Sequence, residues 1–119
     1  MIDSRLQEKI NSLLRSLGAQ EPVEYELGTP QLVETTEVFE LIDIGSCIVP
    51  YLLEVIKSEK PKVTAYIVLV LGKLGDARTI KPLRELREKY QKQKHKTEWD
   101  YAVIGQCNVA IDALDHAKK

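Results

Sequence analysis

The residues that most resemble a chemical motif are two glycines on either side of a lysine in residues 69–83, LVLGKLGDARTIKPL. A phosphate-binding P-loop requires glycine, four further residues, and then Gly-Lys followed by Ser or Thr, whose hydroxyl holds a metal ion. Here Leu74 follows Gly72-Lys73, and only two residues separate Gly72 from Gly75. The dinucleotide pattern Gly-x-Gly-x-x-Gly is also absent. The segment is therefore predicted to be a turn between two packed helices.

The histidines and cysteines do not form a pattern typical of a metal site or a nucleophile. His95 lies among lysines that would repel a cation, and the Asp112–His116 pair favours a surface hydrogen bond over metal binding. Cys47 lies near a predicted helix start and is the less inert thiol, but no histidine is close to it in sequence. Cys107 lies in an apolar context, and we expect no disulfide between the two. We predict no catalytic residue, no metal and no cofactor.

Charge is divided unevenly along a chain whose net charge is −1. Residues 21–43 hold seven acids and no base, whereas residues 78–96 hold eight bases and two acids. One interpretation is that these are solvated faces of opposite sign that attract each other within the fold. The other is a polarised binding surface. For this second interpretation the candidate partner-binding residues are acidic Glu34, Glu37, Glu40 and Asp43, and basic Lys81, Arg84 and Lys92.

The basic segment raises the question of nucleic acid, because a basic helix face can neutralise phosphates. The chain as a whole is slightly acidic, with a pI near 6.1, and neither its tryptophan nor its phenylalanine lies in the basic run. Nucleic-acid binding is therefore kept as an alternative that the composition disfavours. The sequence has no run of 18 apolar residues and begins without a basic and apolar leader, so we expect a cytoplasmic protein without a membrane span.

At 119 residues, the chain is predicted to be one domain with mostly helical periodicity. The first predicted helix covers residues 4–17, with Ser4 and Gln7 as a capping box and Gly18 as its stop. Residues 19–30 are interpreted as a loop in which VEYEL could be extended. Thr29-Pro30 then resembles an N-cap followed by proline in the first turn, which predicts a helix from there to Ile44.

The second half of the chain continues with helices separated by glycine and proline. Ser46 begins a short helix, and Lys60-Pro61 begins one that reaches Leu74 and is apolar on nearly every side. Such a helix is usually enclosed by neighbours, although the same residues would also permit a buried strand. Asp76 is expected to cap the following helix, and Thr97 with Asp100 forms a weaker capping box before a final helix that runs to the C-terminus.

Residues 41–56 and 71–86 resemble each other. Each copy has an apolar residue before a glycine, Gly45 or Gly75, and an isoleucine two places before a proline, Pro50 or Pro82. The two prolines are 32 residues apart. A period of this size is typical of stacked helical hairpins, because one hairpin cannot bury its apolar face by itself.

The second copy, LGKLGDARTIKPLREL, resembles a HEAT-type repeat of the short kind named after phycobilisome lyase subunits. The matching positions are Leu71-Gly72, Leu74-Gly75-Asp76, Arg78 and Pro82-Leu83. The resemblance implies that Asp76 caps the second helix and that Arg78 ties neighbouring repeats together. The first copy departs from the pattern at Ser46-Cys47, where Gly-Asp and the arginine are missing. The expected structural turn residues are Gly45, Pro50, Gly75, Asp76, Arg78 and Pro82.

The expected fold is all-α: a short α-solenoid of two to three HEAT-like helical hairpins with an N-terminal helix. Its expected parts are an N-terminal helix and loop (1–30), a first repeat (31–58), a second repeat (61–93) and a terminal helix or half repeat (97–118). Such arrays usually hold another protein on an extended surface. We therefore predict a non-enzymatic protein–protein interaction module, a small scaffold or adaptor. The alternatives are an accessory factor in bilin attachment to or detachment from phycobiliproteins, which rests on the resemblance, and self-association as a homodimer.

Overall fold

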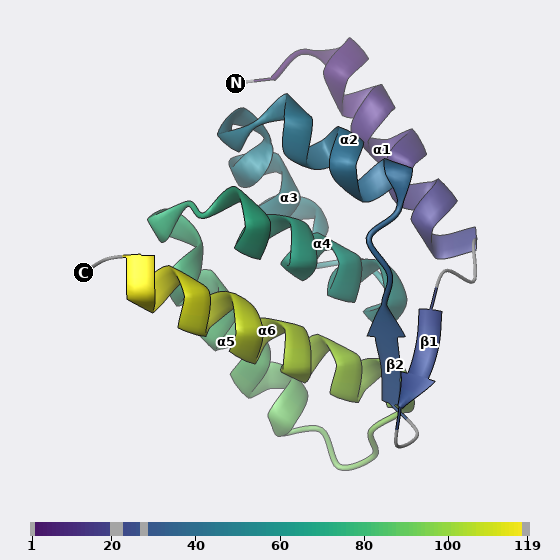
Figure 1. The fold of residues 1–119 in the computed structure, drawn as a ribbon, viewed down its shortest axis with the longest axis vertical. Helices are drawn as coiled ribbons and strands as arrows, with labels where there is room; N and C mark the ends of the chain where they lie inside the picture. Colours follow the sequence, from purple (N-terminus) through teal and green to yellow (C-terminus); the bar gives the residue numbers. More distant parts are fainter. Residues whose placement is uncertain (1, 20–22, 27–28, 118–119) are drawn as a thin grey trace.

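The computed structural model describes residues 2–19, 23–26 and 29–117, and these residues are mostly helical (Figure 1). The helices are α1 (Ser4–Ala19), α2 (Thr36–Ile44), α3 (Val49–Val55), α4 (Pro61–Leu74), α5 (Ile80–Gln91) and α6 (Glu98–Ala117). Two 3₁₀ turns, η1 (Ser46–Ile48) and η2 (Ala77–Thr79), lead directly into α3 and α5. The two strands are β1 (Val23–Glu26) and β2 (Thr29–Leu32). The all-α fold class is confirmed at this coarse level.

The strands form an antiparallel hairpin in which Val23 is opposite Leu32 and Glu26 is opposite Thr29. The extended alternative for VEYEL is therefore confirmed at residues 23–26, while residue 27 lies outside the described residues. The prediction that a helix begins at Thr29-Pro30 is wrong, because both residues belong to β2 and α2 begins only at Thr36. The fixed φ of proline suits an extended strand as well as a first helical turn. Packing of β2 against α6 accompanies the extended form.

α4 is the centre of the fold and is enclosed by other helices. Eight of its residues are buried, including Tyr66, and α1, α2 and α6 all pack against it. In Figure 1, α2, α4 and α6 follow one another across the near side of the molecule, and α3 and α5 lie behind them. The strand alternative for this segment is wrong, and the expectation of an enclosed helix is confirmed. The Cα radius of gyration, 13.6 Å, matches the value of about 13.5 Å expected for a compact domain of this length.

Capping interactions begin the first and last helices. The amide of Leu6 donates to the Asp3 carboxylate over 2.9 Å, so Asp3 and not Ser4 provides the side-chain cap of α1. At the start of α6 the amide of Thr97 donates to Asp100 over 2.8 Å, and the amide of Asp100 donates back to the Thr97 hydroxyl over 3.3 Å. This reciprocal pair is the capping box predicted from the sequence.

Two glycines with positive φ end α2 and α4. Gly75 has φ 72° and ψ 25°, the left-handed conformation common after a helix C-terminus. Gly45 has φ 99° and ψ −175°, a combination that is essentially restricted to glycine. Both glycines therefore allow the chain to reverse and enter a 3₁₀ turn, which confirms that helices end at these positions.

α4 and α6 approach each other closely at Gly72. A Cβ atom at Gly72 would lie 2.9 Å from the Cβ of Ala110 and 3.2 Å from its Cα. Contacts below 3.0 Å are essentially never seen for real Cβ atoms, so only glycine permits this spacing. Gly72, one of the glycines that suggested a phosphate loop, therefore serves helix packing.

We expect Gly72→Ala to destabilise the protein. The added methyl group would force α4 and α6 apart at a cost of about 1–3 kcal/mol, which exceeds the gain of about 0.5–1 kcal/mol from replacing glycine within a helix. Gly105→Ala is the matched control, because Gly105 lies within α6 with nothing within 4 Å of its added Cβ. Gly105→Ala should raise the free energy of unfolding, measured by urea denaturation. A Gly72→Ala protein as stable as the Gly105→Ala protein would contradict this packing argument.

Candidate functional site

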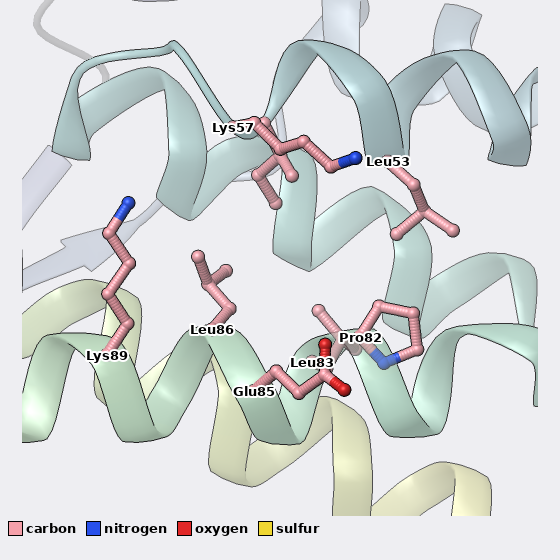
Figure 2. Close-up of a pocket in the computed structure, with 8 residues that line it drawn as sticks. Leu53, Lys57, Pro82, Leu83, Glu85, Leu86 and Lys89 are labelled. Carbon is pink, nitrogen blue, oxygen red and sulfur yellow. The ribbon is translucent and has the colours of Figure 1, made fainter.

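An open groove of ≈ 210 Å³ lies between α3 and α5 (Figure 2). One wall comes from the end of α3 and the residues after it, and the other from the first two turns and the middle of α5. Five of its eight lining residues are apolar, and Leu83 and Ile56 among them are buried. The lining residues are Leu53, Ile56, Lys57, Pro82, Leu83, Glu85, Leu86 and Lys89.

A lysine follows each of the two similar segments and lies on one wall of the groove. Lys57 lies seven residues after Pro50, and Lys89 lies seven residues after Pro82. Figure 2 shows Leu86 and Lys89 rising from α5 toward the wall that carries Leu53 and Lys57. The helix period places Pro82 and Lys89 on one side of α5, whereas Lys57 lies two residues beyond the end of α3. A lysine therefore borders the apolar floor on each wall.

The charged side chains around the groove are exposed, and Lys57 forms an ion pair there with another exposed side chain. The Nζ atom of Lys57 lies 3.3 Å from the Glu54 carboxylate, and more than 70 % of each side chain is exposed. Such a surface pair contributes little to stability and exchanges readily with other ions. Lys89 and Glu85 are exposed and have no ion pair among the described residues. The groove thus combines an apolar floor with a rim of two lysines and one glutamate.

The four predicted acidic residues do not form one free patch. Glu34 precedes α2 and pairs with Lys73 of α4 over 2.9 Å, while Glu37 accepts a hydrogen bond of 2.7 Å from Ser16 of α1. Glu40 and Asp43 are exposed on α2. Half of this group therefore joins elements of the fold, but its partners Lys73 and Ser16 lie outside the basic residues 78–96, so these contacts are not the attraction between the two charged segments that one interpretation expects. A partner-binding role for these residues stays a prediction.

The predicted basic residues are also divided. The guanidinium of Arg84 lies 3.2 Å from the carboxylate of Asp115 on α6. The ammonium of Lys92, the C-cap residue of α5, lies 2.8 Å from the carboxylate of Glu88 on the same helix. The Lys92 ammonium holds the pKa of Glu88 below its ordinary value by hydrogen bonding. Lys81 is exposed on α5 and is not among the residues that line the groove. None of the three predicted basic residues lines the groove, and a partner-binding role for them stays a prediction.

The turn before α5 is organised by Asp76 and Arg78. The Asp76 carboxylate accepts a hydrogen bond of 2.9 Å from the backbone amide of Arg78, which confirms Asp76 as the cap of this turn. The Arg78 guanidinium also donates to Asp76, with Nη2 2.6 Å from Oδ2. The Arg78 guanidinium therefore binds the residue two positions before it. Within the described ranges its side chain forms no hydrogen bond or ion pair with another helix, which the implied tie between repeats would require. Pro50 and Pro82 lie in the first turns of α3 and α5.

The two thiols differ strongly in environment. Cys107 is buried, and desolvation raises the pKa of its thiol to about 12. Cys47 is exposed, and both cysteines are free. Within the described ranges no group of three or more His, Cys, Asp and Glu side chains could hold a metal ion. His116 contacts the backbone oxygen of Asp112 over 2.8 Å, which raises the pKa of the histidine.

Other hollows differ from the groove. A cleft of ≈ 380 Å³ between α1, α3 and the start of α4 is lined by Arg15 and Glu59 among others, and the Tyr51 hydroxyl donates to Asn11 across it over 2.7 Å. A hollow of ≈ 100 Å³ lies between α4 and α6, beside Lys73 and Val109. No helix in the described part of the chain is both long and apolar enough to cross a membrane.

Comparison of the chain with protein-family models, with curated proteins and with solved structures finds no match in any of the three. The functional argument therefore depends on the geometry of the groove. The sequence does not single out this groove, because leucines at helical spacing are common to every packed helix face. The signal that could have found it is the lysine seven residues after each of Pro50 and Pro82.

We expect Asp76→Asn to make the protein less stable at neutral pH and equally stable in strong acid. Hydrogen bonds from the side chain and backbone of Arg78 hold the pKa of Asp76 below its ordinary value of 3.8. A lowered pKa in the folded state stabilises the fold above the unfolded-state pKa, and this contribution is lost as the pH falls through the folded-state pKa. Urea denaturation of both proteins from pH 7 to pH 2 measures the difference. A difference that does not shrink below pH 4 would contradict the assignment.

Alkylation should distinguish the two cysteines. At pH 8 iodoacetamide is expected to label Cys47 in the native protein and to leave Cys107 unmodified, because a buried thiol with a pKa of about 12 is almost wholly protonated. Mass spectrometry of the digested protein locates the label. In urea both cysteines should react, which is the control for reagent access. Equal labelling of Cys107 in the native state would overturn this description.

Proposed function

We propose that this chain is a non-enzymatic protein–protein interaction module, a small scaffold or adaptor, built on two HEAT-like helical hairpins. In this proposal α2 with α3 forms the first repeat, α4 with α5 forms the second, and α6 is the first helix of a third. Support comes from the shared order of helix, glycine, 3₁₀ turn and proline-containing helix in both pairs. The terminal helix α1, packed on α2 and α4, would cover one end of the array.

The observation that carries the proposal is the groove between α3 and α5. It is open, largely apolar and lined by both hairpins, so a partner lying in it would contact the two repeats at once. Its volume of ≈ 210 Å³ is below the roughly 300–1,000 Å³ of pockets that enclose small molecules. Room on this scale suits the anchoring side chains of a protein partner. The expectation that the chain is not an enzyme remains a prediction.

The proposal predicts that partner binding depends on specific surface residues. The full chain is used to capture proteins from the cells that produce it. The captured protein is then purified and titrated calorimetrically against the wild type, two test variants and one control variant. Lys81→Glu/Lys89→Glu reverses the charge of two exposed lysines of α5, of which Lys89 lines the groove, and Glu40→Lys/Asp43→Lys reverses the charge of the exposed acids of α2. We expect at least one of them to weaken binding about tenfold, since like charges placed at an interface repel.

The matched control is Lys9→Glu/Lys94→Glu, which reverses two exposed lysines, one on α1 and one in the connection before α6. It should leave the affinity unchanged. Thermal melting of each variant checks that the fold is intact. Unchanged affinity in both test variants would show that the proposed surfaces do not bind the partner. If no captured protein still binds after purification, the proposed function is contradicted.

A further inference from the structure

We propose that the groove between α3 and α5 binds an amphipathic helix of a partner protein, with leucine-type side chains on one face and acidic residues beside them. This inference rests on the proposed function and names the chemistry of the partner. It is carried by the arrangement of the apolar floor and by the charge of the rim. Leu53, Pro82 and Leu86 of the floor are half-buried, Ile56 and Leu83 are buried, and the charged side chains of the rim are exposed.

The shape of the groove fits a helix. Its walls are two helices, and on α5 the lining residues Pro82, Leu86 and Lys89 recur at the spacing of one helix face. The ridge of side chains on a third helix can pack between two such walls, as ridges pack into grooves in helical proteins. An occupant would present apolar residues at positions i, i+3 or i+4, and i+7. Those residues would meet Leu53, Leu83 and Leu86.

The charge of the rim selects an acidic helix. Lys57 and Lys89 border opposite walls, and Glu85 is the acidic residue of the lining. The lining therefore carries two ammonium groups and one carboxylate. Glu54, outside the lining, forms the exposed pair with Lys57. Arg84 and Lys92 do not belong to the lining and are engaged by Asp115 and Glu88.

The basic character of the surrounding helix agrees with this preference. α5 together with Lys92 carries five basic and two acidic residues. Carboxylates on a bound helix could replace Glu54 as the partner of Lys57 and could supply a first partner for Lys89. A basic helix would instead place like charges against the lysines, which is costly at an interface. The groove therefore favours acidic over basic occupants of the same shape.

The test uses a fluorescein-labelled synthetic peptide of about 18 residues, which is longer than the roughly 12–15 residues below which isolated helices are marginal in water. Its leucines follow the spacing i, i+4, i+7, and glutamates flank them. One comparison peptide carries lysine in place of each glutamate, and another carries serine in place of each leucine. Fluorescence anisotropy with the full chain measures each affinity. At about 0.05 M salt we expect the glutamate peptide to bind at least tenfold more tightly than either comparison peptide, and this advantage over the lysine peptide should shrink at about 0.5 M salt.

Variants of the protein locate the binding site. Leu86→Gln should weaken binding of the glutamate peptide about tenfold, because it places an amide on the apolar floor. Lys57→Gln/Lys89→Gln should weaken it about fivefold and reduce its salt dependence. The controls are Val109→Gln, an exposed apolar residue on α6, and Lys9→Gln on α1, which should bind as the wild type does. Thermal melting confirms that each variant is folded.

The inference is overturned if the lysine peptide binds as well as the glutamate peptide, or if the groove variants bind like the controls. It is also overturned if the protein sediments as a dimer that Leu86→Gln dissociates, because the occupant would then be a second copy. Displacement of the peptide by an equal concentration of single-stranded oligonucleotide would point to nucleic acid instead. A captured partner that depends only on Glu40 and Asp43 would leave the proposed function standing while this inference fails.

Discussion

The enclosure of α4 is the constraint on which the rest of the structure depends. Val63–Val68 form an unbroken buried run, and water must be excluded from every side of that part of the helix. One neighbour cannot do this, so α1, α2 and α6 all pack on it. The contact with α6 is close enough at Gly72 that no side chain fits there. The order of helices around α4 follows from this demand.

The same packing explains where a partner could be received. α3 and α5 are not enclosed in this way on the sides that face the groove between them. Leu53 and Leu86 remain half-buried at this open groove. Elsewhere the Glu34–Lys73 and Arg84–Asp115 ion pairs join separate parts of the fold. Lys89 remains beside the groove without such a partner among the described residues.

Local signals in the sequence predicted much of the helical structure. The ends of α2 and α4 follow from Gly45 and Gly75, and the start of α6 follows from the Thr97–Asp100 box. Prediction failed at Thr29-Pro30, where the residues fit the start of a helix equally well by local criteria. Pairing with β1 and packing against α6 decided for a strand. Both interactions join β2 to another element of the fold, and local periodicity carries no information about them.

The sequence by itself determined the helical class, the positions of the main turns and the internal similarity of residues 41–56 and 71–86. These are consequences of backbone propensity, capping and apolar spacing, which act within a few residues. Only the tertiary structure decided which charges pair and which surround a groove. Arg84 and Lys89 lie on the same short helix, yet one contacts α6 and the other borders the groove. Which partner each side chain meets depends on where the neighbouring helices pack, and this is set by the tertiary structure.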